Sequence, residues 1–303
     1  MSFRADHFLK FKGVQGSNQN QLFDTMSEDD IVSLFVELLN NGVHGLCFSL
    51  YEEGQKPGDT ISEKQIRKRL EILQPYIGWI RSFSTTEGNE FIPKIAKEYG
   101  IKTLVGAWLG DDEVKNRKEI VNLLQLAEDN CVDIAAVGNE VLYRGDLPVD
   151  QLITIIEDVK NQIPGIPVGY VDAYYEFLVH PEITELCDVI LSNCYPFWEG
   201  THFDHSLLHF QHMYAQAKSA AKDKKVIVTE TGWPSKGQTL GKAVPGEMNA
   251  MKYFINSQLW TLDEEIEMFY FSSFDESWKI ASEGEVGAYW GLWDSKGKLK
   301  FIQ

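Results

Sequence analysis

The sequence predicts an α/β fold: a single (β/α)8 TIM barrel with an extra N-terminal helix. From about residue 44 onward, a short apolar run, a polar loop and a helix-period segment follow one another repeatedly. The apolar runs show little alternation, which is typical of strands buried on both faces. Eight such βαβ units can close into a barrel. An open doubly wound sheet is the alternative, but no Gly-x-Gly-x-x-Gly follows an early strand. The predicted strands are 44–50, 77–83, 102–109, 133–140, 166–173, 188–196, 225–233 and 268–275.

The segments between these runs have the pattern of amphipathic helices. Ser62 and Gln65 have the spacing of a capping box before one of them. Pro148 precedes another, and Gly100 follows a third, as a left-handed C-cap would. A further apolar stripe, at residues 31, 34, 35, 38 and 39, predicts the extra helix before the first strand.

Composition limits the domain organisation and the partners. The chain has 303 residues with 28 Lys and Arg against 45 Asp and Glu, a net charge of −17. This acidic balance argues against nucleic acid and anionic membranes as partners. No Pro-, Gly- or Ser-rich linker divides the chain, so residues 29–303 are expected to form one catalytic barrel, after a polar arm over 1–28. Nothing demands a partner chain, and a monomer is expected.

Targeting and redox features are sparse. No apolar run approaches the roughly 20 residues of a membrane helix. The start of the chain lacks the apolar stretch of a signal peptide, so we expect either an intracellular protein or one whose signal has been removed. The compartment stays open. Four scattered cysteines among apolar neighbours predict buried free thiols.

Two carboxylates end predicted strands. The fourth run ends at Glu140 and the seventh passes through Glu230. In an α/β barrel both would point to the mouth, where active sites form. A salt-bridge cap is the ordinary alternative for either one alone. Two carboxyl groups about 5–5.5 Å apart are what retaining glycoside hydrolysis requires, one protonated and one ionised. Asn139, beside Glu140, would then donate to the sugar 2-hydroxyl.

Other polar and aromatic residues near predicted strand ends suit a sugar site. A sugar ring stacks on aromatic side chains, although any single one at a strand end is more often core. For Glu276 and Lys279 two readings stay open: they pair only with each other, or Lys279 lies near Glu140 with Glu276 orienting it; we favour the second. The aromatic residues at these strand ends are Trp108, Tyr170, Tyr195, Trp233 and Phe274, of which Tyr170, Tyr195 and Trp233 are predicted substrate contacts.

The chain resembles glycoside hydrolase family 17, the β-1,3-glucan-active barrels of clan A. The matching stretches are Ala-Val-Gly-Asn-Glu-Val at 136–141, Asn-Cys-Tyr-Pro-Phe at 193–197, Val-Thr-Glu-Thr-Gly-Trp-Pro-Ser-Lys-Gly at 228–237 and Phe-Asp-Glu-Ser-Trp-Lys at 274–279. The resemblance implies that Glu140 is the acid/base and Glu230 the nucleophile. It also implies substrate contacts for Asn139, Tyr195, Glu276 and Lys279.

The loop over 197–203 is short and differs from the plant members, so the chain is closer to the compact microbial branch. Tyr143, Trp198 and Glu199 could hold an acceptor sugar there, which would let transfer compete with water. The sequence therefore predicts a β-1,3-glucanosyltransferase, with β-1,3-glucan or laminari-oligosaccharides as donor and acceptor. The alternatives are a β-1,3-glucan hydrolase and, from another class, a non-catalytic glucan-binding barrel.

One further pattern could hold a metal. His202, His205, His209 and His212 have the spacing of one helical face, which could ligate zinc. Their place on an outer helix predicts a solvated face instead. We therefore expect no metal, and no cofactor, since no Gly-rich phosphate cradle is present.

Overall fold

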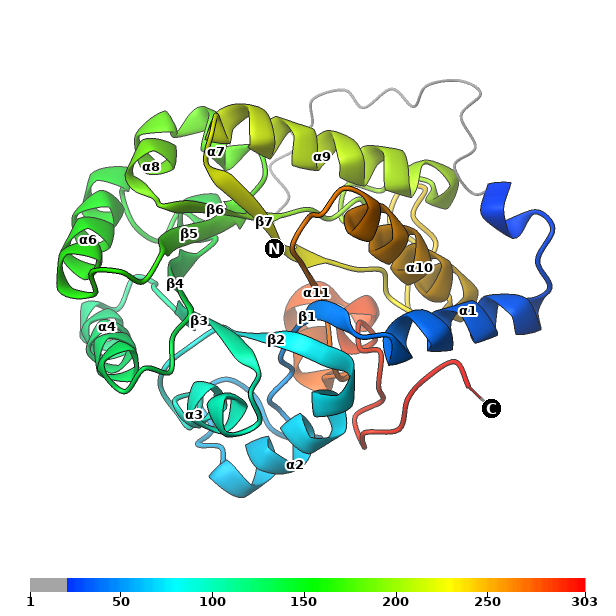
Figure 1. The fold of residues 1–303 in the computed structure, drawn as a ribbon, viewed down its shortest axis with the longest axis horizontal. Coiled ribbons are helices and arrows are strands. Elements are labelled where there is room, and N and C mark those ends of the chain that lie inside the picture. Colours follow the sequence, from blue (N-terminus) through cyan, green and yellow to red (C-terminus); the bar gives the residue numbers. More distant parts are fainter. Residues whose placement is uncertain (1–20, 303) are drawn as a thin grey trace.

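A computed structural model describes residues 21–302, and these form a closed barrel of eight parallel strands in the order β1 to β8 (Figure 1). The predicted (β/α)8 barrel is confirmed. Residues 1–20, most of the arm predicted over 1–28, lie outside the described residues. The strands are β1 Val43–Cys47, β2 Ile77–Ser82, β3 Lys102–Ala107, β4 Ile134–Asn139, β5 Val168–Ala173, β6 Val189–Asn193, β7 Lys225–Thr231 and β8 Met268–Tyr270.

Strand β8 is much shorter than the predicted run over 268–275. Beyond Tyr270 the backbone leaves the sheet, and its amides find partners elsewhere: Ser272 donates to Trp290 at 3.0 Å, and Phe274 pairs with Trp293 in an isolated parallel bridge. The apolar character continues because this segment is buried, although it no longer belongs to the barrel wall.

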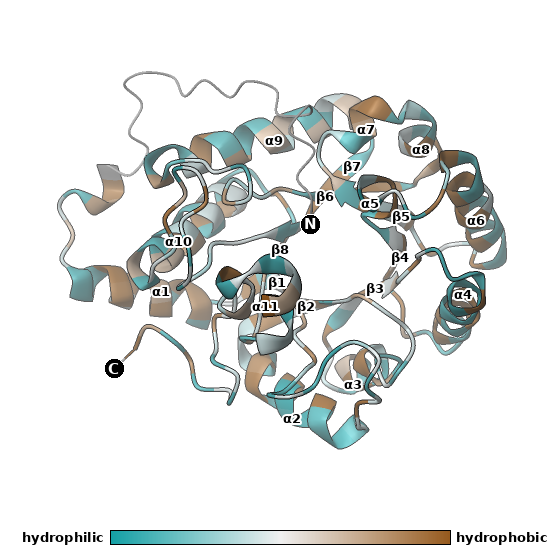
Figure 2. Cartoon of the chain, turned by 180° about the vertical axis from the view of Figure 1, so that it is seen from behind, coloured by the Kyte–Doolittle hydropathy of each residue, from teal (hydrophilic) through white to brown (hydrophobic). Residues whose placement is uncertain are grey.

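Helices surround the barrel (Figure 1). In α6 the buried side chains are Leu152, Ile156 and Val159, which have the predicted helical spacing. Two very short helices, α5 and α11, follow the ends of β4 and β8 and lie at the end of the barrel that faces the viewer in Figure 2. The helices are α1 Glu28–Asn40, α2 Glu63–Leu73, α3 Phe91–Glu98, α4 Glu113–Glu128, α5 Val141–Arg144, α6 Val149–Gln162, α7 Glu176–Val179, α8 Pro181–Leu186, α9 Ser206–Ala221, α10 Glu247–Asp263 and α11 Ile280–Glu283.

The extra helix α1 completes the outer ring. No long helix follows β8 among the described residues, and α1 packs against α10 instead (Figure 1). Its Ile31, Phe35 and Leu39 are buried, as the predicted apolar stripe requires. The ring therefore closes with a helix from the start of the chain, which keeps the barrel wall covered beside β1 and β8.

Helix ends follow local capping chemistry. Ser27 and Asp30 form a full capping box at α1. At α2, Ser62 accepts from Gln65, but the Gln65 side chain donates to Leu50 instead of returning to Ser62, so only half of the predicted box forms. Asp112 caps α4. Among residues 21–302, no helix is both long enough and apolar enough to cross a membrane.

Candidate active site

The two predicted carboxylates meet at the mouth of the barrel through one shared amide. Asn193, at the end of β6, donates from Nδ2 to Glu140 at 2.9 Å and to Glu230 at 3.1 Å. Since both bonds end on Oε1 atoms, these two atoms lie no more than about 6 Å apart, which suits the spacing of a retaining pair better than the roughly 6.5–9.5 Å of an inverting one. The Asn193 side chain is itself fixed, because Thr229 donates to its Oδ1 at 2.8 Å. Barrel closure therefore brings the ends of β4, β6 and β7 to one point.

Glu230 is surrounded by donors. The Arg81 guanidinium, 1% exposed, donates to its Oε1 at 2.7 Å. The Tyr195 hydroxyl donates to its Oε2 at 2.7 Å. Together with Asn193, three donors from two segments, β2 and the end of β6, hold this carboxylate, and one of them carries a full positive charge. A buried carboxylate with such partners is held as an anion in a fixed orientation.

Glu140 lies in a different setting. It follows β4 directly and has a left-handed backbone with φ 52°, which is uncommon for a residue with a side chain. Burial, followed by the nearby charge of Glu230, raises the pKa of Glu140 to about 7. Arg81 and Arg144 act in the opposite direction but do not overcome burial. This arrangement can keep one carboxyl protonated near neutral pH while the other is ionised.

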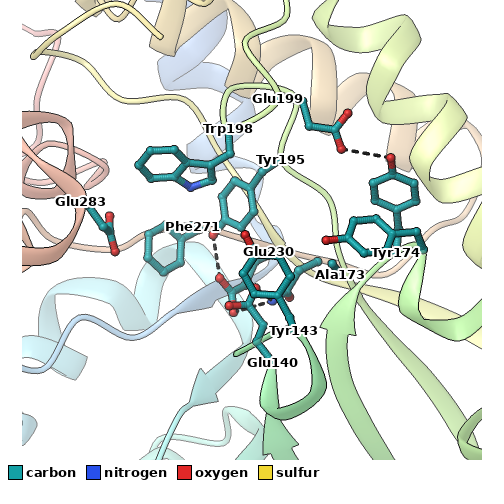
Figure 3. Close-up of a pocket in the computed structure, with 12 residues that line it drawn as sticks. Glu140, Tyr143, Ala173, Tyr174, Tyr195, Trp198, Glu199, Glu230, Phe271 and Glu283 are labelled. Atoms are coloured by element: carbon teal, nitrogen blue, oxygen red, sulfur yellow. Dashed lines mark hydrogen bonds between the residues drawn. The ribbon is translucent and has the colours of Figure 1, made fainter. Parts of the chain in front are cut away.

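The pocket above these carboxylates contains about 660 Å³ of space, part of it open to solvent. Four predicted substrate contacts line it: Tyr143, Tyr195, Trp198 and Glu199 (Figure 3). Sugar rings stack on such aromatic walls, and their hydroxyls bond to carboxylates. The remaining lining residues are Glu140, Ala173, Tyr174, Tyr175, Asn193, Glu230, Phe271 and Glu283.

Two predicted aromatic substrate contacts, Tyr170 and Trp233, do not line the pocket. Tyr170, 1% exposed, lies under the end of β4, where its hydroxyl donates to Asp172 and accepts from the Leu142 amide. Trp233, also 1% exposed, packs against Phe197 and donates its indole N–H to a backbone carbonyl. Each side chain is buried and bonded to other protein groups, so neither can stack on a sugar.

The polar residues predicted around the pair are close to it but differently connected. Asn139 accepts from Arg81 at 2.7 Å, so its Oδ1 is held by the protein and only its amide N–H group could donate to a sugar. Lys279 and Glu276 form a buried ion pair at 2.7 Å. The carboxylates that raise the pKa of Lys279 are those of Glu276, Glu283 and Glu230. Lys279 therefore pairs with Glu276 and feels the charge of Glu230, while its placement near Glu140 itself stays a prediction.

Arg81, Asn193 and Glu283 were not predicted as site residues. Arg81 gave the same signal as the two glutamates, a charged residue near the end of an apolar strand, and that signal was enough to find it. Asn193 lies inside a stretch that matched the family. Glu283, whose pKa is raised to about 7 by burial, comes from α11 and follows no strand directly, so no local pattern indicated it.

The other candidates lie away from this chemistry. All four cysteines are free and buried, as predicted. The four histidines do not share one helix, because His202 and His205 precede α9. His209 is 2% exposed, so the predicted solvated face was wrong there. Within residues 21–302 no group of three or more His, Cys, Asp or Glu side chains could hold a metal ion.

Comparison with known proteins identifies the family. The family model described as the BtgE/BtgC glycoside hydrolase domain matches residues 45–291. The chain belongs to this glycoside hydrolase family. The chain is similar to the solved structure of the glycoside hydrolase family 17 beta-1,3-glucanosyltransferase from Rhizomucor miehei, with a TM-score of 0.77 and 26% identity. The alignment covers 86% of this chain and 96% of that one. The resemblance to family 17 is thereby confirmed.

Curated relatives agree with this placement. The glucan 1,3-beta-glucosidase of Schizosaccharomyces pombe is 29% identical to this glycoside hydrolase over 254 residues, which are 77% of this chain and 78% of that protein. The probable beta-glucosidase btgE of Aspergillus flavus is 28% identical over 261 residues, 82% of this chain but 42% of the longer relative. A mutant of the Rhizomucor miehei enzyme is described in complex with laminaritriose.

Proposed function

We propose that this glycoside hydrolase cleaves β-1,3-glucan with retention of configuration and transfers the released glycosyl unit to another glucan. The observation that carries the proposal is the pair Glu140 and Glu230, held within about 6 Å of each other by Asn193, near the separation that a retaining mechanism needs. The catalytic unit is the barrel over residues 29–303, acting as a monomer.

In the proposed first step, Glu230 attacks the anomeric carbon as its bond to the leaving oxygen breaks, and Glu140 gives its proton to that oxygen. In the second step Glu140 takes a proton from the incoming hydroxyl, whose oxygen displaces Glu230 from the anomeric carbon. The donors around Glu230 support the nucleophile role, because they orient an ionised carboxylate. The raised pKa of Glu140 supports the acid/base role.

The choice of β-1,3-glucan is supported by the relatives. Their names specify glucan 1,3-beta-glucosidases and a beta-1,3-glucanosyltransferase, one of them in complex with laminaritriose. The aromatic and acidic lining of the pocket fits a neutral oligosaccharide.

Transfer in preference to hydrolysis is supported by the side chains beyond the carboxylates. Tyr143, Trp198 and Glu199 all line the pocket, and a sugar bound among them would have a high local concentration beside the glycosyl-enzyme intermediate. Water is the competing acceptor, and an enzyme that used only water would be the predicted hydrolase.

The test is product analysis with one laminari-oligosaccharide of defined length. Mass spectrometry should show products both shorter and longer than the substrate, and NMR of early products should show retained β configuration. Shorter products alone would leave the hydrolase, and an inverted anomer would refute the retaining pair. If purified protein binds laminarin but never turns it over, the non-catalytic alternative holds.

A further inference from the structure

His209 reaches the wall of the sugar pocket from an outer helix. It lies on α9 and is 2% exposed. Its Nε2 lies 2.9 Å from Glu199 Oε2, and its Nδ1 lies 2.6 Å from the Thr201 hydroxyl. Both ring nitrogens are therefore engaged with the short segment between β6 and α9, and one of them touches a residue that lines the pocket.

Glu199 has an unusual environment for an acidic loop residue. Its side chain is only 10% exposed, and Oε1 accepts from the Tyr174 hydroxyl at 3.0 Å (Figure 3). A carboxylate has about four acceptor sites, and these two contacts use one on each oxygen. The group still borders the pocket, where sugar hydroxyls are the natural donors for the acceptor sites that remain.

The neighbouring Trp198 is held by other aromatic rings. Its ring lies 5.4 Å from that of Trp290 and 5.6 Å from that of Phe197. Glu199 instead depends on Tyr174 and His209, of which only His209 lies on the helix that follows this segment. A flexible glutamate without the imidazole would reach for solvent and turn away from the pocket.

We propose that His209 is a positioning residue that holds the Glu199 carboxylate against the pocket and thereby sets how tightly the acceptor sugar binds. The inference deepens the proposed function and rests on it. His209 touches no reacting atom, and we assign its effect on the acceptor to its contact with Glu199.

The experiment measures the rate at which the full chain transfers the glycosyl unit of an activated laminaribiosyl donor to a laminari-oligosaccharide acceptor. The acceptor concentration is varied to obtain the acceptor KM. In His209→Ala the acceptor KM should rise about tenfold or more, the usual effect of losing a hydrogen bond to a charged group. The transfer-to-hydrolysis ratio should fall, while donor cleavage at saturating donor stays within about twofold. His209→Gln should restore much of the acceptor KM, because its amide nitrogen can reach the same carboxylate. His212→Ala, at an exposed position of the same helix, is the matched control.

A double-mutant cycle guards against a general packing defect. If His209 acts through Glu199, adding His209→Ala to Glu199→Ala should change the acceptor KM no further. Additive losses, or an unchanged acceptor KM in a folded His209→Ala protein, would overturn the inference. Should His209→Ala not fold, the cycle is run with Thr201→Val, which removes the bond to Nδ1, and the same outcomes decide. An inactive wild-type protein would instead defeat the proposed function.

Discussion

The ends of β4 and β7 carry the same side chain in opposite environments. Glu230, on β7, accepts hydrogen bonds from Arg81, Tyr195 and Asn193. Glu140, after β4, shares only the Asn193 amide, and burial raises its pKa to about 7. The two side chains are chemically identical, so their different roles come from the different numbers of hydrogen-bond donors around them. The Asn193 amide between them limits their separation but does not give them the same environment.

The largest effect should come from removing the carboxylate of β7. Glu230→Ala should lower kcat by roughly 10⁴-fold or more, because the carboxylate proposed to attack the anomeric carbon is lost. Steady-state hydrolysis of laminarin measures this loss. Added azide should partly restore turnover with a product of inverted configuration, because a small anion then takes the vacated place. Near-normal turnover without azide would remove Glu230 from the mechanism.

Removing the carboxylate that follows β4 should have a smaller effect, and the effect should depend on the leaving group of the substrate. Glu140→Gln should lower kcat on laminarin by about 10²–10⁴-fold, the range of a general acid. With a dinitrophenyl glycoside, whose leaving group needs no proton, the bond-breaking step should remain close to that of the wild type. A pre-steady-state burst measures that step. Equal losses on both substrates would show that the two carboxylates do not divide the work as proposed.

The third effect is on pH dependence. Because the pKa of Glu140 is about 7 and the acid must hold its proton, kcat/KM should fall as pH rises through about 7. Arg81 lowers this pKa by its charge, so Arg81→Met should move the basic limb to higher pH. It should also cost about 3–5 kcal/mol of unfolding free energy, because it leaves Glu230 buried without its charged partner.

Two variants control this experiment. Arg81→Lys keeps the positive charge, so its basic limb should stay close to that of the wild type. Glu283 also lines the pocket with a pKa raised to about 7, but the charges that act on it are those of Lys279, Glu230 and Glu276. Glu283→Gln should therefore leave the fall of kcat/KM above about pH 7 unchanged. If this fall disappears in Glu283→Gln, the titrating group is Glu283 and not Glu140.

The sequence was sufficient for the barrel and for this pair, because eight apolar runs have a clear period and buried charges at strand ends are conspicuous. It was insufficient for Tyr170 and Trp233. Strands buried on both faces lack the alternation that would show which side chains point to the mouth. The extent of β8 was overpredicted for a similar reason, since 271–274 remain buried after leaving the sheet. His209 lies on the buried side of α9 with Phe210 and Met213. The spacing of the four histidines indicated a polar face and gave no sign that one of them is buried.

A smaller effect should come from Tyr170, which supports the end of β4 from below. Its hydroxyl accepts from the Leu142 amide at 2.8 Å, in the first turn after Glu140. Tyr170→Phe leaves that buried N–H unpaired, at a cost of about 1–3 kcal/mol of unfolding free energy. Because the left-handed backbone of Glu140 loses support, kcat should fall by up to about tenfold with KM unchanged.

Tyr253 offers the matched variant under β7. Its hydroxyl bonds to the Thr231 side chain at 2.6 Å, directly after Glu230, and touches no backbone amide there. Tyr253→Phe should destabilise the fold by about 0.5–1.5 kcal/mol and leave kcat nearly unchanged, since Arg81, Asn193 and Tyr195 still orient Glu230. Denaturant unfolding and initial rates measure both variants. Equal losses of kcat would mean that both strand ends depend on the packing beneath them, and that the donors at the mouth do not by themselves hold the carboxylate of β7.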